Sequence, residues 1–572
     1  MSPIDWIVLC GTLFFIVLYG VLKTRHIKTT EGFLRGDGNS RWWLIGISIM
    51  ATQASAITFL STPGQAYADG MSFVQFYFGL PLAMVILCVF ALPLYYRLRV
   101  YTAYQFLESR FDLKTRTLTS ILFLIQRGLA AGITIYAPSI ILSTILGWNL
   151  NITNVIIGTL VIIYTVAGGT QAVSQTQKQQ MIIIMGGMFL AFYFCIQLLP
   201  EGTGLHDALY VAGETGRLNV IDFNFDLSNR YNVWSGLIGG TFLFLSYFGT
   251  DQSQVQRYLS GKSLNESRMG LMFNGFFKIP MQFFILLVGV LVFVFFQFYQ
   301  SPLHFNPANT AIVMSSDQAE NYSALEAEFQ LLHETKSNLI LEYTQLRQDV
   351  GRGQQTDVLA DEIRNLMAAE NQMRSQAKDL IVEANPNLDM KDTDYVFITF
   401  VLNFLPVGLI GLLLAVIFSA AMSSTASELN ALATTTVVDI YKRNFKQEAT
   451  DKHYLNASKG FTIMWGLIAL AFATFASLFE NLIQAVNIIG SLFYGAILGV
   501  FVAAFFMKHL KGKHIFPAAL IAEAMVIGIF YLDNQGVINL GYLWLNLIGC
   551  VLVMLVGQML YYILGPGKKK ME

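Results

Sequence analysis

Charged side chains are scarce in this sequence, and their scarcity excludes a soluble globular protein. Asp, Glu, Lys and Arg make up 13% of the 572 residues and hydrophobic residues 54%, with a mean hydropathy of +0.53. A soluble chain carries roughly a quarter of charged residues, so we expect a polytopic membrane protein. The net charge of −1 argues neither for nor against a partner, because in such a protein the position of each charge matters.

Cysteines and clusters of catalytic side chains are also lacking. The four cysteines fall within apolar runs and show neither metal-ligand nor redox spacing, so we interpret them as buried free thiols. The apolar runs contain no His, Asp and Glu cluster suited to metal chemistry and no Ser/His/Asp set, so we do not expect an enzyme. A basic segment before the first apolar run is missing too. Pro3 to Leu22 is therefore interpreted as a span rather than a cleavable signal peptide.

Long apolar runs predict thirteen membrane spans. They lie near residues 4–22, 42–67, 72–95, 119–147, 153–168, 178–199, 234–250, 272–298, 397–425, 459–478, 482–507, 515–532 and 541–564. Lys and Arg gather in alternate connections, such as Lys23 to Arg41 and Arg97 to Arg116, and in the tail Lys568 to Lys570. By the positive-inside rule these segments are cytoplasmic, which predicts an N-terminus outside and a C-terminus inside.

Two of these spans are interrupted by polar or helix-breaking residues. The second contains "SIMATQASAITFLSTPGQAYADG", and the seventh contains "IGGTFLFLSYFGTDQ" with three glycines. Interrupted spans at corresponding positions of two halves indicate discontinuous helices at a midplane binding site. Spans two to six and seven to eleven then form two groups of five. Because five is odd, the second group starts from the opposite side of the membrane, which predicts an inverted repeat.

The large polar stretch from Gln300 to Asp394 is predicted to form a helical hairpin. Its apolar residues follow a heptad rhythm in two segments, which "GRGQQTD" at 351–357 separates. The predicted topology puts this antiparallel coiled-coil pair outside the cell. Whether it docks a partner, covers the mouth of the protein or only packs on itself stays open.

A run of hydroxyl-bearing residues within an apolar segment suggests a cation site. In the stretch from Gly408 to Tyr441, Ala420, Ser423 and Ser424 share one helical face. Two hydroxyls and a carbonyl could converge there, and the absence of a carboxylate among these three residues favours Na⁺ over Ca²⁺ or Mg²⁺. From this stretch alone the alternative stays open that the hydroxyls bond to their own helix or to a neighbouring one.

Several motifs occur together and in one order along the chain. They are "EGFLRGDGNSRWWLIGISIMATQASAITFLSTPGQAYADG", "IYAPSIILSTILGW", "AGGTQAV", "TDQSQVQRYLSGKS", "NGFFKIP" and "AMSSTASELNALATTTVVDIY". With them the chain resembles the sodium/solute symporters, a family that includes bacterial sugar and sialic acid transporters. The resemblance implies an all-α polytopic protein with a leucine-transporter-like core of five plus five inverted helices, one extra N-terminal helix and two extra C-terminal helices. It also implies Na⁺-driven uptake by alternating access in a bacterial inner membrane, by a monomer.

The resemblance divides the chain into consecutive segments. These are an accessory helix with a cytoplasmic loop (1–41), a first repeat (42–199), an external loop (200–233), the first two helices of the second repeat (234–299), the hairpin insert (300–395), the rest of the second repeat (396–507) and two C-terminal helices with a basic tail (508–572).

The family's main sodium site is matched by residues from two of these spans. The implied ligands are the main-chain carbonyls of Ala51, Ala54 and Ala420 and the hydroxyls of Ser423 and Ser424. Unwound helix leaves carbonyls free, and such oxygens can replace the water of the ion. Some members hold a second Na⁺ with an aspartate. Gln177 stands at that position here, and a neutral amide offers no charge to a second cation, so we predict one Na⁺ per cycle.

The solute site is predicted from polar residues that face the same region. The candidates are Gln53, Ser55, Thr58, Gln75, Arg127, Tyr247 and Asn487. Tyr77 and Phe244 replace the acid and the asparagine that hold sugar hydroxyls in relatives, which argues against a hexose bound in that manner. For each polar candidate, an interhelical hydrogen bond is the structural alternative.

Arg127 is the most informative of these candidates. It lies inside a predicted span, where a charge indicates function, and a guanidinium pairs with a carboxylate through two parallel bonds. Its position resembles the arginine that holds the carboxylate in sialic acid transporters. The alternative is that Arg127 extends to the cytoplasmic boundary. For Lys278 we expect a structural or gating role.

Together these observations predict a Na⁺-coupled symporter that imports a small organic solute, with one Na⁺ site. The preferred solute is a carboxylate such as a sialic acid or another organic acid. The alternatives are a neutral sugar or polyol symporter and a transporter-like sensor that acts through a separate partner, for which the hairpin is a docking place. Besides the solute and the lipid bilayer we expect no nucleic-acid partner.

Overall fold

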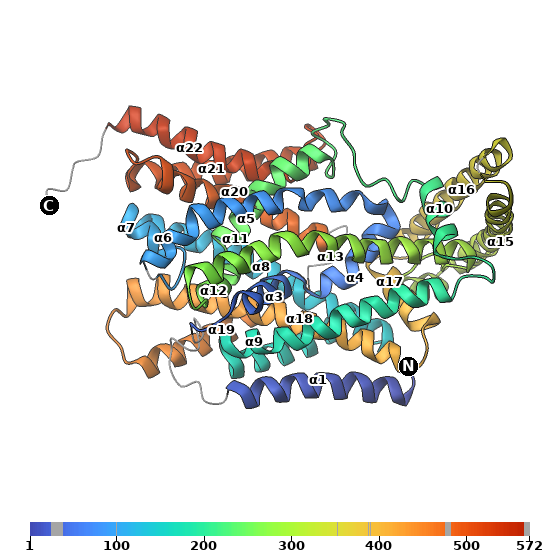
Figure 1. Ribbon diagram of the computed structural model, residues 1–572, viewed down its shortest axis with the longest axis horizontal. Coiled ribbons are helices and arrows are strands. Elements are labelled where there is room, and N and C mark those ends of the chain that lie inside the picture. Colours follow the sequence, from blue (N-terminus) through green and yellow to red (C-terminus); the bar gives the residue numbers. More distant parts are fainter. Residues whose placement is uncertain are drawn as a thin grey trace.

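The chain forms an elongated bundle of helices in the computed structural model (Figure 1). The structure describes residues 1–24, 38–98, 100–351, 353–386, 388, 390–474 and 482–565. Among these residues there are many helices and no strand, so the predicted all-α class is confirmed. Most helices run along the long axis of the molecule. Most of the basic loop between Lys23 and Arg41, and the tail from Lys568 to Lys570, lie outside the described residues.

The helices follow one another with short connections. They are α1 (Pro3–Thr24), α3 (Trp42–Gln53), α4 (Ala56–Asp69), η1 (Gly70–Gly79), α5 (Leu80–Val89), α6 (Ala91–Leu98), α7 (Gln105–Arg110), α8 (Leu113–Leu146), α9 (Leu150–Gln197), α10 (Leu205–Glu214), η2 (Ser235–Gly239), α11 (Gly240–Gly249), α12 (Gln252–Leu259), α13 (Leu264–Phe298), α14 (Pro307–Met314), α15 (Ala319–Val350), α16 (Gln354–Ala384), α17 (Thr393–Phe404), α18 (Leu409–Thr435), η3 (Thr436–Phe445), α19 (Asp451–Ala473), α20 (Leu482–Phe506), α21 (Gly512–Asn534) and α22 (Trp544–Leu564).

The bundle is built from helices suited to a bilayer. Within the described ranges, nine helices are long and apolar enough to cross a membrane, and four shorter apolar helices accompany them. The protein is therefore a multi-pass membrane protein, whereas the count of thirteen spans stays a prediction. The N-terminus lies towards the end of the bundle that carries α15 and α16, and helix α22 ends at the opposite end (Figure 1).

The second predicted span is broken, as its sequence indicates. Helix α3 ends at Gln53 and α4 begins at Ala56, so that Ala54 and Ser55 form a short non-helical link. Ala54 has a ψ of 77° and Ser55 a ψ of 178°, outside the helical region. The seventh predicted span is not broken in the same way. It begins with the π-helical turn η2, which continues into α11 through Gly239 and Gly240 in helical conformation, and the chain leaves the helix only at Thr250, where the predicted span ends.

The prediction of one span over 397–425 is wrong at its start. The chain forms two helices there, α17 and α18, with a break between Phe404 and Leu409. Pro406 lacks an N–H for the helix, and Gly408 has a φ of +90°, which glycine adopts without steric cost. Asp5 of α1 accepts hydrogen bonds from the N–H groups of Gly408 (2.6 Å) and Gly411 (3.2 Å), and so satisfies the exposed donors at the start of α18.

Helix α9 contains both of the predicted spans 153–168 and 178–199. The hydroxyls of Tyr164 and Thr176 lie 3.0 Å apart, although twelve residues of straight helix would separate them by about 18 Å. The two apolar stretches Leu150–Val166 and Thr176–Gln197 are therefore two segments rather than one straight rod, as the sequence predicts.

The polar insert forms the predicted pair of helices. Helices α15 and α16 pack against each other, and Gly351 between them has a φ of +78°. The pair is fixed to the bundle by hydrogen bonds from Lys336 to Gln297 (2.9 Å) and from Arg374 to the Leu303 carbonyl (3.0 Å). It therefore packs on the bundle as well as on itself.

Candidate functional site

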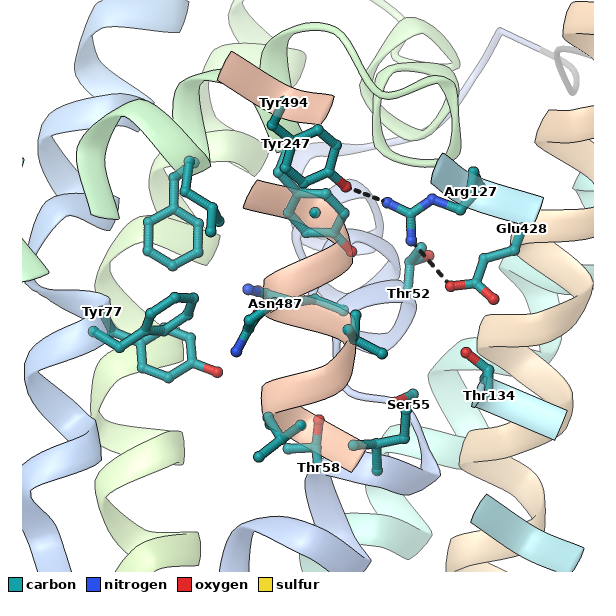
Figure 2. A pocket seen from close by; sticks show the side chains of 18 residues that line it. Thr52, Ser55, Thr58, Tyr77, Arg127, Thr134, Tyr247, Glu428, Asn487 and Tyr494 are labelled. Carbon is teal, nitrogen blue, oxygen red and sulfur yellow. Dashed lines mark hydrogen bonds and ion pairs between the residues drawn. The ribbon is translucent and has the colours of Figure 1, made fainter. Parts of the chain in front are cut away.

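A cavity lies beside the break between α3 and α4. The space between its walls, including the part open to solvent, is about 690 Å³. Its walls come from the α3–α4 link, η1, α8, α11, α18 and α20. Figure 2 shows Arg127, Glu428 and Thr134 on one wall and the aromatic Tyr77 on the opposite one.

Six of the seven residues predicted to bind solute line this cavity. They are Gln53, Ser55, Thr58, Arg127, Tyr247 and Asn487. One polar atom among them, Gln53 Oε1, is buried and has no hydrogen-bond partner, whereas the side chain of Asn487 has Tyr542 as its hydrogen-bond neighbour. A buried amide oxygen without a partner costs free energy, so Gln53 favours a polar ligand in the cavity.

Gln75 is the candidate that the structure does not bring to the cavity. Its amide donates to the carbonyls of Ser72 (3.3 Å) and Tyr231 (2.8 Å) and accepts from the N–H of Asp222 (2.9 Å). These bonds use its polar atoms within the protein. Gln75 therefore has the structural role stated above as the alternative to solute binding. Its hydrogen bonds hold the loop before η2 against η1.

Arg127 points into the cavity but is already paired with two protein carboxylates. One of its terminal nitrogens, Nη2, pairs with Asp251 and with the hydroxyl of Tyr494 (2.5 Å), and the other, Nη1, donates to Glu428 Oε1 at 3.1 Å. The Tyr247 ring lies 5.3 Å from its guanidinium carbon. Arg127 is 3% exposed, so it does not extend to the membrane boundary. A solute carboxylate would have to share this guanidinium with Glu428 or Asp251.

Asp251 and Glu428 are functional candidates that our sequence analysis missed. Asp251 follows the break after α11 and caps α12 through the N–H of Ser253 (2.9 Å). Glu428 lies in the buried part of α18, and its Oε2 atom has no partner. A signal was present in the sequence, because Glu428 is an acidic residue within a predicted helix of apolar and small residues, where ionisable side chains are rare and mark function.

The predicted sodium ligands lie where α18 packs against α3 and α4. Ala51 and Ala54 sit at the end of α3, where a helix leaves its last carbonyls without helical partners. Ser424 donates to the carbonyl of Ala420 at 2.8 Å, so its hydroxyl bonds within its own helix. Ser423 Oγ is buried and has no partner. The carbonyl oxygens at the end of α3 and the unpartnered hydroxyl of Ser423 fit a small hard cation, whose ligands are oxygen atoms.

Gln177 joins three helices next to these residues. Its Oε1 accepts from Ser48 (2.5 Å), and its Nε2 donates to Thr52 (3.0 Å) and Ser427 (3.3 Å). Ser427 in turn donates to the carbonyl of Ser423 (2.8 Å). A neutral amide therefore occupies the centre of this small polar cluster of α3, α9 and α18.

Lys278 on α13 does not line the cavity but lies directly behind it. Its Nζ is buried, has no hydrogen-bond partner and lies 5.7 Å from the centre of the Tyr77 ring. Tyr77 is a wall residue of the cavity. The lysine therefore touches the site through an aromatic ring, which agrees with the structural or gating role that we expect.

Comparison with known proteins agrees with this architecture. The model of the sodium:solute symporter family matches residues 33–341 and 379–521. The chain is 27% identical to bovine sodium-coupled monocarboxylate transporter 2 over 492 residues, which are 85% of this chain and 66% of that protein. It is 25% identical to the human sodium/iodide cotransporter, over 84% of this chain and 62% of that one. It thus spans about two thirds of the length of these relatives.

Two bacterial proteins match over nearly the whole chain. The sodium/sialic acid symporter SiaT of Proteus mirabilis is 24% identical over 99% of this chain and 96% of its own length. A solved structure described as the substrate-bound outward-open state of a Na⁺-coupled sialic acid symporter superposes with a TM-score of 0.73 at 22% identity, and 99% of both chains is covered. The structural likeness establishes the fold.

Proposed function

Because the chain belongs to the sodium:solute symporter family, we propose that it imports a small organic solute together with Na⁺ by alternating access. Proteins of this family are sodium-coupled transporters, not enzymes. The proposal includes the inverted repeat of five plus five helices, which the interrupted segment α3–α4 supports. The N-terminus and the hairpin then lie outside the cell and the C-terminus inside.

The observation that carries this proposal is the cavity at the helix break. It lies inside the bundle and contains buried polar atoms that have no partner, Gln53 Oε1 and Glu428 Oε2. A purely structural core satisfies its polar atoms. Broken helices that offer backbone groups at mid-depth are the places where transporters bind solutes and ions.

Sodium binds, in this proposal, between the end of α3 and the middle of α18. The ligands are the carbonyls of Ala51, Ala54 and Ala420 and the hydroxyls of Ser423 and Ser424. The unpartnered Oγ of Ser423 supports this placement. Because the two helices belong to different repeats, an ion held by both stabilises one relative position of the repeats over another. Gln177 leaves a second cation without a charged ligand, which supports one Na⁺ per cycle.

A carboxylate is the solute class that we propose first. Arg127 supplies a guanidinium fork inside the cavity, and the relatives named above include transporters of monocarboxylates and sialic acid. A neutral sugar or polyol is the second candidate. It is favoured by one observation, the pairing of Arg127 with both Asp251 and Glu428.

A thermal-shift screen of the purified protein tests this proposal. Organic acids, sugars, polyols and amino acids are added in NaCl and in KCl of equal ionic strength. A ligand that binds the folded protein raises the unfolding temperature by mass action, and we expect carboxylates to do so more strongly in NaCl. Uptake into proteoliposomes along a Na⁺ gradient then measures transport. Ligand effects that are equal in both salts would contradict Na⁺ coupling, and a response to neutral ligands alone would exclude the carboxylate.

A further inference from the structure

The two carboxylates that pair with Arg127 are held very differently. Asp251 Oδ2 receives Arg127 and the hydroxyl of Tyr494 (2.9 Å), while Oδ1 receives the N–H and the hydroxyl of Ser253 (2.9 and 2.7 Å). Both of its oxygens are thus occupied. Glu428 contacts Arg127 through Oε1 at 3.1 Å, and the hydroxyl of Thr134 is the other hydrogen-bond neighbour of its carboxylate. Glu428 is therefore the partner of Arg127 that can leave at the smaller cost in hydrogen bonds.

Glu428 also lies one helical turn from the proposed sodium ligands. Ser424 and Glu428 stand four residues apart on α18, so their side chains project from the same face. Side chains in a helix lean towards its N-terminus, which for Glu428 is the direction of Ser424. A rotation about its side-chain bonds can thus bring the carboxylate from Arg127 towards the sodium ligands.

The charges of the cavity leave room for one more cation. Arg127 is the single cation that lines the cavity among the described residues, and it faces two carboxylates, Asp251 and Glu428. A buried charge without a counter-charge is costly. The proposed sodium site consists of neutral oxygens only, so Glu428 is the nearest carboxylate along α18 that can offset the charge of the ion.

We propose that Glu428 couples the ion to the solute by changing partners. In the absence of Na⁺ it pairs with Arg127, and when Na⁺ binds it turns towards the ion and frees Nη1 of Arg127 for a carboxylate of the solute. This inference rests on the sodium site of the proposed function. It makes Na⁺ a requirement for tight solute binding, because only the ion releases the guanidinium.

The test measures Na⁺ binding by purified, full-length protein without any solute. Unfolding temperature is recorded against NaCl concentration, with KCl added to keep the ionic strength constant, for the wild type and for Glu428→Gln and Arg127→Gln. We expect Glu428→Gln to raise the half-saturating Na⁺ concentration by about tenfold. We expect Arg127→Gln to lower it, because Glu428 then has no competing partner, and the double variant to match Glu428→Gln.

The opposite signs of the two single variants separate this role from simple damage. If Arg127 and Glu428 only held the helices together, both changes would weaken Na⁺ binding, and that result would overturn the inference. An unchanged half-saturating concentration in Glu428→Gln would overturn it as well. Glu523→Gln is the control, because Glu523 on α21 is a second buried glutamate, whose carboxylate has no partner and does not line the cavity. A wild type that is stabilised equally by Na⁺ and K⁺ would instead refute the proposed function.

Discussion

Two arginine–carboxylate contacts connect the same pair of antiparallel helical segments, and they differ in their balance of charge. Arg116 and Arg127 lie on α8, and their partners Asp439 and Glu428 lie on η3 and α18. The same number of residues separates the two arginines as separates the two carboxylates. Arg116, Asp439 and Glu108 form the Arg116 cluster, and Arg127, Asp251 and Glu428 form the Arg127 cluster.

The Arg116 cluster is nearly saturated with partners. Arg116 donates through Nε to Asp439 (2.8 Å), through Nη1 to Glu108 (2.6 Å) and through Nη2 to the carbonyl of Val438 (3.0 Å), and Arg443 also pairs with Glu108. Two arginines thus face two carboxylates, although Asp439 Oδ2 is buried without a partner. The Arg127 cluster has one cation for two carboxylates and leaves Arg127 Nε and Glu428 Oε2 without partners. The comparison teaches that the balance of charge, rather than burial of charge, separates a structural contact from a binding site.

Breaking the saturated cluster should have the largest effect. Arg116→Met leaves Asp439, which is 0% exposed, without its cation, and we expect a loss of about 3–5 kcal/mol in the free energy of unfolding. Thermal unfolding in detergent measures it. Adding Asp439→Leu should recover most of the loss, since an apolar pair replaces a buried ion pair at little cost. A loss as large in Glu428→Gln would remove the distinction between the clusters.

Removing the hydroxyl of Ser423 or Ser424 should weaken Na⁺ binding and hardly change the free energy of unfolding. We expect Ser423→Ala and Ser424→Ala to raise the half-saturating Na⁺ concentration for transport by about tenfold, the equivalent of one lost ligand bond of roughly 1.4 kcal/mol. Ser458→Ala is the control, because this buried serine on α19 bonds the carbonyl of Tyr454 (2.8 Å) away from the site. Uptake against NaCl concentration is the measurement. Unchanged Na⁺ dependence in both serine variants would exclude the site.

Features that depend on neighbours in sequence could be predicted, and those that depend on distant pairing could not. The break at Ala54 and Ser55 and the turn after α15 follow from local polar, proline and glycine patterns. The pairing of Arg127 with Glu428 joins α8 to α18, and no local pattern reveals it. The rule that identified Arg127, a charge inside a span, missed Glu428 because the predicted span ended at residue 425, whereas α18 continues to Thr435. We interpreted the serine-rich sequence around Glu428 as an ion site built from hydroxyls, and the glutamate was therefore missed.

The amide of Gln177 offers a way to change the charge next to the Arg127 cluster. Ser48, Thr52 and Ser427 already direct oxygens towards position 177, so Gln177→Asp would place a carboxylate among them. We expect the Na⁺ dependence of uptake to become steeper, with a Hill coefficient that rises from about 1 towards 2 as a second ion binds. Gln177→Asn, which keeps the neutral amide, is the control. A coefficient that stays near 1 in Gln177→Asp would mean that charge at this position does not decide the number of ions.

The ion pairs of the hairpin are buried where it meets the bundle, and there the comparison predicts the smallest effect, a dependence of hairpin docking on pH. Burial holds the pKa of His304 below its ordinary value, although Asp392 lies 3.4 Å away. Burial opposes the ionisation of Glu370, but hydrogen bonds from His333 and Lys336 outweigh it and lower the pKa of Glu370. A group with a lowered pKa stabilises the docked state above its ordinary pKa and loses that contribution as the pH falls. Docking should therefore weaken below pH about 6.5 through His304, and further below about 4.5 through Glu370.

Hydrogen exchange of α15 and α16 at pH 7.5 and 5.5, corrected for intrinsic rates, measures this effect. We expect faster exchange at pH 5.5 in the wild type and a smaller difference in His304→Gln, which cannot take up the proton. Equal pH sensitivity in both proteins would assign the effect to other groups. Because the Arg127 cluster is enclosed by the bundle, the same change of pH should leave exchange in α8 unaltered, which distinguishes the contacts of the hairpin from those of the cavity.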